Sequence, residues 1–274
     1  MLIETLSTFP HMYDSVMGES MMKRAQEKGI LEFRAHDLRD WTHDRHRTTD
    51  DDPYGGGAGL VMKCDPIFEA VEAILGKEFV EAKLAAAPPQ GESQQRSSAA
   101  PQIVFLAPQG CPFDDAYADK LAAADHLLFI CGHYEGIDER VYALADHVIS
   151  LGDYVLTSGE LASMVVIDAA VRKLPGVLGA AEGPVDESFT SGLLEYPQYT
   201  RPADFRGMAV PEVLTSGNHA AIARWRREQS LARTAAARPD LIAAAEAAGR
   251  LTPADQKFLK LLEPAPTGAA EGVS

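Results

Sequence analysis

The chain has 274 residues, 46% hydrophobic and 24% charged, which is typical of a globular protein with one large or two ordinary domains. It has no run of about 18 consecutive apolar residues, and its N-terminus lacks the basic region and apolar core of a signal peptide. We therefore expect a cytoplasmic protein without a membrane span. The formal net charge of −15 excludes a uniformly basic surface, so any polyanionic partner would need a local cluster of Lys and Arg.

The first 178 residues alternate between strand and helix signals. Apolar runs or alternation predict strands at 3–7, 30–35, 103–107, 127–131 and 147–151, and helical spacing predicts helices at 12–28, 66–75, 115–124 and about 159–173. Ser158 is placed to cap the last helix. This order predicts an α/β domain, residues 1–178, with a largely parallel sheet.

Two segments of this domain lack periodicity. Residues 37–59 are rich in His, Arg, Asp and Gly, and a long loop of this kind inside a compact domain is usually functional. Its run YGGGAG lacks the strand, the helix and the Lys-Ser/Thr that nucleotide-binding glycine motifs require, so a flexible turn is the simple interpretation. Residues 85–102, rich in Pro, Ser and Gln, predict an exposed insertion.

The C-terminal part has a different character. Residues 179–195 predict a linker, and residues 196–274 a small helical domain with helices at 218–236, 239–248 and 253–262, no strand signals, and a frayed tail. Thr252 is a suitable N-cap for the last helix, with Pro253 at its first position. Between residues 195 and 238 there are seven Arg and four acidic residues, a locally basic stretch.

Metal and redox chemistry have little support in the sequence. Three cysteines occur (Cys64, Cys111 and Cys131), no two of them spaced as a CxxC pair, which indicates a reducing compartment and no structural zinc. The His and Asp residues between 43 and 52 fit no standard metal spacing. We therefore expect no metal ligands.

Two of the predicted strands, 127–131 and 147–151, run directly into loops headed by Gly132 and Gly152. Ligands of open α/β sheets collect beyond the carboxyl ends of the strands, and glycine lets them approach the main chain closely. The pattern indicates one pocket lined by backbone groups. Two ordinary strand–loop–helix turns are the alternative.

Long motifs carry a resemblance to a known family. CGHYEGIDER (131–140) and SLGDYVLTSGEL (150–161) resemble the cofactor loops of the bacterial tRNA (guanine-37-N1)-methyltransferases, the TrmD family of knotted SPOUT methyltransferases. Similar motifs occur in the family's order at 42–62 (THDRHRTTDDDPYGGGAGLVM), 106–110 (LAPQG), 172–179 (RKLPGVLG), 195–202 (EYPQYTRP) and 214–234 (LTSGNHAAIARWRREQSLART). The likeness covers nearly the whole chain apart from 85–102 and the tail.

The resemblance implies a fold, a reaction and partners. It implies a trefoil knot formed by the segments around 127–173, and a homodimer that builds each site from both chains. It also implies methyl transfer from S-adenosylmethionine to N1 of guanosine 37 in tRNA. A Mg²⁺ requirement is a family trait that no residue here reveals.

The implied cofactor pocket consists of three loops whose main chain can read an adenine ring. Glu135 and Asp153 are carboxylates suited to lie near the sulfonium, although either could be a surface acid. The residues that the resemblance assigns to the cofactor are Leu106, Pro108, Gly132, Tyr134, Glu135, Gly136, Ser150, Leu151, Gly152, Asp153, Tyr154, Val155, Leu156, Ser158 and Gly159.

The reaction needs a base for the N1 proton and a cation for the charge that builds on O6. The resemblance assigns the cation to Arg172. The family's basic Asp corresponds to Glu187 here, with Asp186 one residue earlier as the other candidate. Both acids could instead be solvated linker residues.

The resemblance also implies tRNA contacts in both domains. Tyr134 and Glu135 would face the target base. The glycine run would lie against the tRNA and the cofactor region of the other subunit. Trp225 is expected in a core, with the arginines beside it in contact with phosphates rather than in ion pairs. The remaining contacts are assigned to Arg45, Arg47, Asp50, Tyr54, Gly55, Gly59, Arg201, Arg224 and Arg227.

Other functions remain open on the sequence. A knotted methyltransferase acting on another RNA would share these loops. A nucleotide-dependent oxidoreductase would also use an α/β domain, although the missing strand–GxGxxG–helix unit counts against it. A non-catalytic RNA-binding module would need the arginines around residue 225 but no organised cofactor loops.

Overall fold

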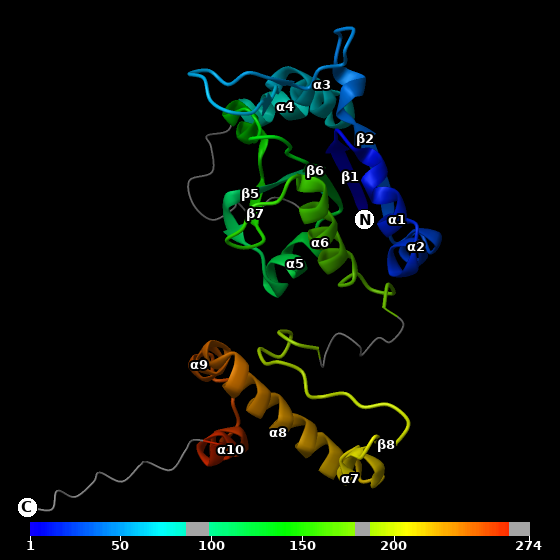
Figure 1. Ribbon diagram of the computed structural model, residues 1–274, viewed down its shortest axis with the longest axis vertical. Helices are drawn as coiled ribbons and strands as arrows, with labels where there is room; N and C mark the ends of the chain where they lie inside the picture. Colours follow the sequence, from blue (N-terminus) through cyan, green and yellow to red (C-terminus); the bar gives the residue numbers. More distant parts are fainter. Residues whose placement is uncertain (86–98, 179–186, 263–274) are drawn as a thin grey trace, which may run out of the picture. The chain divides into compact units, whose positions relative to one another are not determined.

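The computed structural model describes residues 1–85, 99–178 and 187–262, and the chain divides into two compact units, Met1–Ala181 and Glu182–Ser274 (Figure 1). Most of the 85–102 insertion, part of the 179–195 linker and the tail lie outside the described residues. Within the described ranges, no helix combines the length and the apolar character that crossing a membrane requires.

A five-stranded sheet forms the centre of the first unit. Its order is β2-β1-β6-β5-β7, and every neighbouring pair is parallel, as the alternating signals predicted. The strands are β1 (Leu2–Ser7), β2 (Glu32–Asp37), β5 (Gln102–Pro112), β6 (His126–Ile130) and β7 (His147–Ser150).

Helices cover both faces of this sheet, which gives three layers (Figure 1). The two faces have separate cores, one containing Ile3, Phe129 and Ile167 and the other Leu6, Phe105 and Leu128. The first core is covered by α1 (Asp14–Met17), α2 (Ser20–Glu27), α5 (Asp115–Ala122) and α6 (Gly159–Val171), and the second by η2 (Leu38–Trp41), α3 (Cys64–Leu75), α4 (Lys77–Ala85) and η3 (Glu139–Leu144).

Several local predictions for this unit were wrong. The helix predicted at 12–28 is divided into η1 (Pro10–Tyr13), α1 and α2, because Ser20 adopts a φ of 48° at the break. The 37–59 loop contains η2 and also β3 (Asp50–Asp51), which pairs with β4 (Val61–Met62). Helix α4 was missed; it begins directly after Gly76, whose φ of 96° ends α3.

The second unit is mostly helical. Its helices are α7 (Glu212–Thr215), α8 (His219–Ala237), α9 (Pro239–Ala247) and α10 (Pro253–Leu262), around a core of Leu193, Leu231, Ala245 and Leu251. The expectation of no strands was wrong, because β8 (Asp204–Phe205) and β9 (Met208–Ala209) form a two-stranded hairpin. Strands of two residues are too short to show a period of two in the sequence.

Candidate functional site

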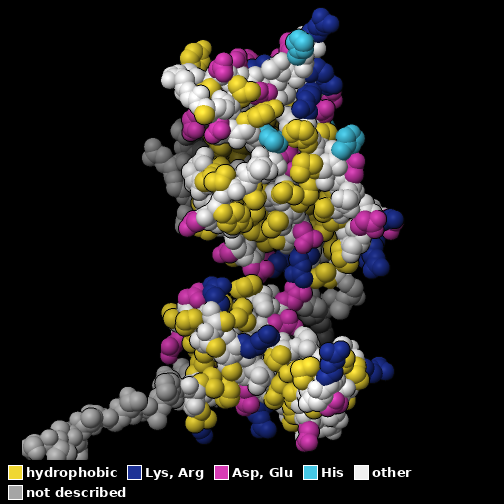
Figure 2. All heavy atoms as spheres, in the orientation of Figure 1, with side chains coloured by type: hydrophobic (Ala, Val, Ile, Leu, Met, Phe, Trp, Pro, Cys, Tyr) yellow, Lys and Arg dark blue, Asp and Glu magenta, His cyan; other side chains and the backbone are white. Residues whose placement is uncertain are grey.

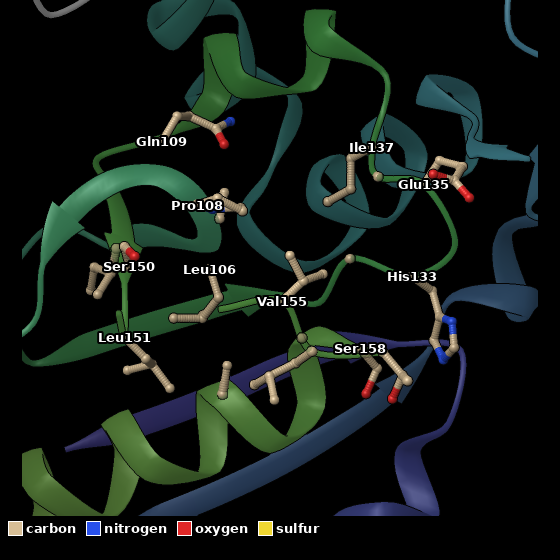
Figure 3. Close-up of a pocket in the computed structure, with 18 of the residues that line it drawn as sticks. Leu106, Pro108, Gln109, His133, Glu135, Ile137, Ser150, Leu151, Val155 and Ser158 are labelled. Carbon is tan, nitrogen blue, oxygen red and sulfur yellow. The ribbon is translucent and has the colours of Figure 1, made fainter. Parts of the chain in front are cut away.

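A bulge in β5 forms the first wall of a cleft at the carboxyl edge of the sheet. Leu106 and Cys111 both pair with Ile149 of β7, so residues 107–110 leave the ladder between them. A Cβ atom on Gly110 would lie 2.5 Å from the backbone N of Ile149, which only glycine avoids. The bulge therefore holds Pro108 and Gln109 at the cleft (Figure 3).

The second wall is the loop that follows β6, and the end of the glycine run packs against it. Glu135 N donates a hydrogen bond to Leu60 O at 3.0 Å, and Met62 N donates to Gly136 O at 2.9 Å. A Cβ atom on Gly59 would lie 2.4 Å from Cγ of Glu135. Gly59 and the residues directly after it thus contact a cofactor loop of their own chain, and the contact of the run with the tRNA and the other subunit stays an expectation from the resemblance.

The third wall is the loop between β7 and α6, which returns to the end of β6. Gly159 N donates to Gly132 O at 2.8 Å, and a Cβ on Gly159 would lie 2.8 Å from Gly132 N. Ser158 makes no side-chain capping bond to α6, contrary to our prediction; its backbone forms an isolated β-bridge with His133 instead. The missing side chain at Gly159 thus allows α6 to begin directly against β6.

These three walls enclose a cleft of about 330 Å³. All the residues assigned to the cofactor line it except Asp153, and Figure 3 shows Leu106, Ile137 and Val155 around the hollow. Four further lining residues belong to the three predicted loops without having been assigned individually (Ala107, Gln109, His133 and Thr157), and the sequence reasoning missed Ile137, Glu139, Tyr142, Ile149 and Ala162. Most of these neighbour assigned residues in the three loops, but Tyr142 comes from η3, and no local pattern pointed to it.

Tyr134 occupies a strained position at this cleft. Its φ of 58° is unusual for a residue with a side chain and costs roughly 1–3 kcal/mol. Burial and the nearby carboxylate of Asp50 raise the pKa of Tyr134. Asp50 of β3 therefore lies beside Tyr134, and both residues were assigned to substrate binding.

A row of aromatic rings and one guanidinium group extends from Tyr134 across the surface of the first unit. The rings of His133 and Tyr134 lie 5.1 Å apart, those of Phe9 and His133 4.9 Å apart, and the guanidinium of Arg39 lies 5.3 Å from the Phe9 ring. Phe9 and Tyr134 are 42% and 44% exposed. This row offers flat surfaces of the kind on which a nucleobase stacks.

The remaining residues assigned to the substrate in this unit lie on exposed loops. Arg45, Tyr54 and Gly55 are exposed, with Tyr54 fully so. Arg47 is already bonded: its Nε donates to Arg39 O at 3.1 Å, and its guanidinium pairs with Asp40. Its charge is therefore partly neutralised within the loop.

The residues assigned to the chemistry do not meet at this cleft within the unit. Arg172 follows the end of α6, and the last residue of this helix that lines the cleft is Ala162, ten residues earlier, so about 15 Å of helix lies between them. Glu187 belongs to the second unit, and Asp186 lies outside the described residues.

The arginines of the second unit differ in their surroundings. Arg227 donates to both carboxylate oxygens of Asp255, at 3.0 and 2.9 Å, and this lowers the pKa of Asp255 to about 2. The expectation that Arg227 avoids ion pairs was therefore wrong. Arg201 and Arg224 are exposed. Trp225 is only partly buried and lies outside the small core, contrary to our expectation.

Comparison with known proteins identifies the family. The family model described as tRNA (Guanine-1)-methyltransferase TrmD matches residues 1–244. The chain belongs to the TrmD family. It is 50% identical over 246 residues to the tRNA (guanine-N(1)-)-methyltransferase of Limosilactobacillus reuteri, covering 90% of this chain and 91% of that protein. It is 51% identical over 260 residues to the enzyme of the same name from Symbiobacterium thermophilum, covering 95% and 97%.

Membership of the TrmD family confirms the resemblance that the motifs carried and makes this protein a methyltransferase. It rules out the alternatives of an oxidoreductase and of a non-catalytic RNA-binding module. Among the residues that the structure describes, no three His, Cys, Asp or Glu side chains gather in a way that could hold a metal ion.

Proposed function

We propose that this enzyme transfers the methyl group of S-adenosylmethionine to N1 of guanosine 37 in tRNA. The observation that carries the proposal is the cleft in which the three glycine-bearing loops of a TrmD-family chain converge. Its volume of about 330 Å³ falls in the range of small-molecule sites. A protein of this activity would work in the cytoplasm, where tRNA is modified.

The cleft has the chemistry that the methyl donor needs. Leu106, Ile137 and Val155 offer apolar surface to an adenine ring, and the loops around them offer main-chain donors and acceptors. Glu135 lines the cleft and Asp153 does not, so we assign the carboxylate near the sulfonium to Glu135. The bound cofactor would supply an electrophilic methyl group.

Tyr134 and Glu135 are our candidates for holding the target guanine. Tyr134 can stack on the base, and the carboxylate of Asp50 lies near its hydroxyl. The Glu135 carboxylate can accept a hydrogen bond from the N1–H or the exocyclic amine. The exposed Arg45, Tyr54 and Gly55, with Arg201 and Arg224 of the second unit, would hold the surrounding RNA.

The chemical step requires a proton to leave N1 as the methyl group arrives. We assign its removal to Glu187, with Asp186 as the other candidate, and the stabilisation of charge on O6 to Arg172. Such a general base would act on the target guanine only once the tRNA is bound. This requirement would link substrate specificity to the chemical step.

We further propose that two copies of the chain complete each site. Arg172 lies about 15 Å along α6 from Ala162, the last residue of the helix that lines its own cleft, which is farther than an arginine side chain can reach. Leu161 and Val165, one helical turn apart on α6, are 47% and 54% exposed, and Figure 2 shows hydrophobic side chains gathered around α6. A second copy would cover this apolar surface and bring its own Arg172.

The contacts between Gly159 and Gly132 support a trefoil knot in the first unit. The chain leaves β7, returns to the end of β6, and enters α6 with Gly159 against Gly132. We propose that the segments around residues 127–173 form this knot. A Mg²⁺ requirement remains an expectation from the family, checked by measuring turnover with and without a chelator.

The test is methyl transfer from labelled S-adenosylmethionine to unmodified tRNA transcripts that carry guanosine at positions 36 and 37, with the product mapped by primer extension. We expect a block at position 37. Glu187→Gln should lower turnover by about 100-fold or more if Glu187 is the base, whereas Asp186→Asn should not. If both variants keep the wild-type rate, the assignment of the base fails. Tight cofactor binding with transfer only to another RNA would favour a different knotted methyltransferase.

A further inference from the structure

The second unit contains a hollow of its own, of about 390 Å³. One side is the extended segment 196–203, which precedes the β8–β9 hairpin, and the other is formed by α7 and one face of α8. Its lining consists of Tyr196, Pro197, Gln198, Tyr199, Thr200, Arg201, Ala203, Val210, Leu214, Thr215, Ile222, Trp225 and Arg226. Neither the cofactor nor the chemical step proposed above uses this hollow.

Three aromatic rings and two guanidinium groups line the hollow. The rings of Tyr199 and Trp225 lie 6.4 Å apart and are tilted by 51°. The guanidinium of Arg226 lies 4.7 Å from the centre of the Tyr196 ring. Tyr199 is 49% exposed and Trp225 is partly exposed, so their faces are accessible rather than packed in a core.

The charge of the lining is the opposite of the charge of the chain. Arg201 and Arg226 are exposed, and none of the described residues that line the hollow is Asp or Glu. The whole chain carries a net charge of −15. Figure 2 shows hydrophobic side chains beside Lys and Arg on this unit. An anionic ligand with a flat apolar part matches both features.

We propose that this hollow binds one unstacked nucleotide of the tRNA, with its base against Tyr199 and Trp225 and its phosphate on Arg226 and Arg201. Stacking on aromatic rings together with a cationic groove is how proteins hold single-stranded nucleic acid. The inference rests on the proposed function in taking tRNA as the ligand, but it concerns a site distinct from the methyl-transfer cleft.

The hairpin offers a matched comparison. Phe205 is 54% exposed, and the guanidinium of Arg206 lies 5.2 Å from its ring, which is the same pairing of aromatic and arginine. Neither residue lines the hollow. A general attraction of RNA to aromatic and basic groups would involve both pairs, whereas the proposed site requires only the residues of the hollow.

The experiment uses the indole of Trp225 as its reporter. The chain has two tryptophans, and Trp41→Phe in the first unit leaves Trp225 alone. An unmodified tRNA transcript is titrated into this variant. We expect saturable quenching of the fluorescence, because a stacked base quenches indole. Tyr199→Leu should weaken tRNA binding by about 5- to 150-fold, while Tyr199→Phe, which keeps the ring, should bind nearly as the parent does.

Further readouts separate stacking from charge. Arg226→Gln should reduce the dependence of log K on log salt concentration by about 0.7–1, whereas Tyr199→Leu should leave that slope unchanged. In methyl transfer, Tyr199→Leu should raise KM for tRNA and leave both kcat and the Kd for S-adenosylmethionine unchanged. Phe205→Leu and Arg206→Gln are the controls and should change affinity less than twofold.

Three results would overturn the site. The first is tRNA binding seen by filter retention without any quenching of Trp225. The second is an equal loss of affinity in Tyr199→Leu and Phe205→Leu. The third is a change in Trp225 fluorescence with protein concentration in the absence of RNA, which would mean that a protein surface covers the hollow. Quenching by a transcript that is bound but never methylated would keep this site and refute the proposed reaction.

Discussion

At the scale of single residues, two glycines determine whether the cleft can form. Neither Gly110 nor Gly159 has a positive φ, so their importance is one of space rather than backbone conformation. Each lies against the main chain of a neighbouring segment, where any Cβ would come within 3 Å of backbone atoms. Backbone cannot yield to a methyl group as a flexible side chain can.

The first prediction concerns Gly110→Ala. The added methyl group must displace β7 or the bulge, so we expect a loss of about 1–3 kcal/mol in stability and cofactor affinity at least 10-fold weaker. Calorimetric titration with S-adenosylmethionine and thermal unfolding measure the two effects. Gly207→Ala is the control: nothing lies near its Cβ position, so it should cost only the strain of its φ of 81° and leave cofactor binding intact. Equal cofactor affinity in both variants would contradict the role of the bulge.

At the scale of elements, a buried histidine fixes β7 to its neighbours. Nδ1 of His147 bonds to the Tyr117 hydroxyl of α5 at 2.9 Å, and Nε2 bonds to Oε1 of Gln102 in β5 at 2.7 Å. Burial, with a smaller contribution from Lys120, lowers the pKa of His147 to about 4. The neutral ring thus belongs to the folded state.

The second prediction is a pH dependence of stability. The unfolded chain takes up a proton on His147 near pH 6.5, whereas the folded chain does so only near pH 4, so stability falls as pH drops between these values, by at most about 3 kcal/mol. Thermal unfolding between pH 7.5 and 4.5 measures this loss. His147→Gln should flatten the profile, and His11→Gln, at an exposed site, should not. Parallel profiles for all three proteins would exclude His147 as the cause.

In the second unit, Asp255 joins two helices. It accepts hydrogen bonds from Thr252 N at 2.9 Å and from Arg227 of α8, and its own N–H donates to the Thr252 hydroxyl at 3.2 Å. Thr252 is therefore the N-cap predicted for α10, within a capping box that Asp255 completes.

The third prediction follows from these bonds. Asp255→Ala should destabilise the second unit by about 1–3 kcal/mol, because it removes the cap partner and leaves Arg227 without its carboxylate. Since the folded pKa of Asp255 lies below that of an unfolded Asp, its contribution is present above about pH 4 and is lost as pH falls toward 2. Chemical denaturation monitored by Trp225 fluorescence checks the loss at neutral pH. Asp240→Ala, which breaks an exposed pair with Arg238, should leave the stability nearly unchanged.

At the scale of the whole molecule, the separation of Arg172 from its own cleft leads to the fourth prediction. Arg172→Ala and Glu135→Ala chains should each be inactive alone, yet mixing them after reversible unfolding should restore about a quarter of the wild-type turnover, because a mixed dimer has one intact site. Methyl transfer measured after mixing tests this. The absence of any recovery, with mixed dimers shown to form, would place Arg172 and Glu135 in the same chain's site.

The sequence alone determined the parallel α/β sheet, the glycine-headed loops after β6 and β7, the helices α8 to α10 and the family. Their apolar residues recur at the spacing of a helix or a strand, or they contain long continuous sequence motifs. Neighbouring residues therefore suffice to recognise them. The strand order, the break at Ser20 and the existence of α4 and the hairpin were not readable in this way.

Only the tertiary structure decided which distant residues meet. It brought Tyr142 to the cleft, set Asp50 against Tyr134, tied Arg227 to Asp255, and left Trp225 facing a hollow rather than a core. Each of these outcomes depends on contacts between segments tens of residues apart, whose free energy comes from packing and desolvation in three dimensions. The local sequence around a residue does not show which distant residue it will contact. The motifs therefore identified the site residues, but not the residues that contact them in the folded protein.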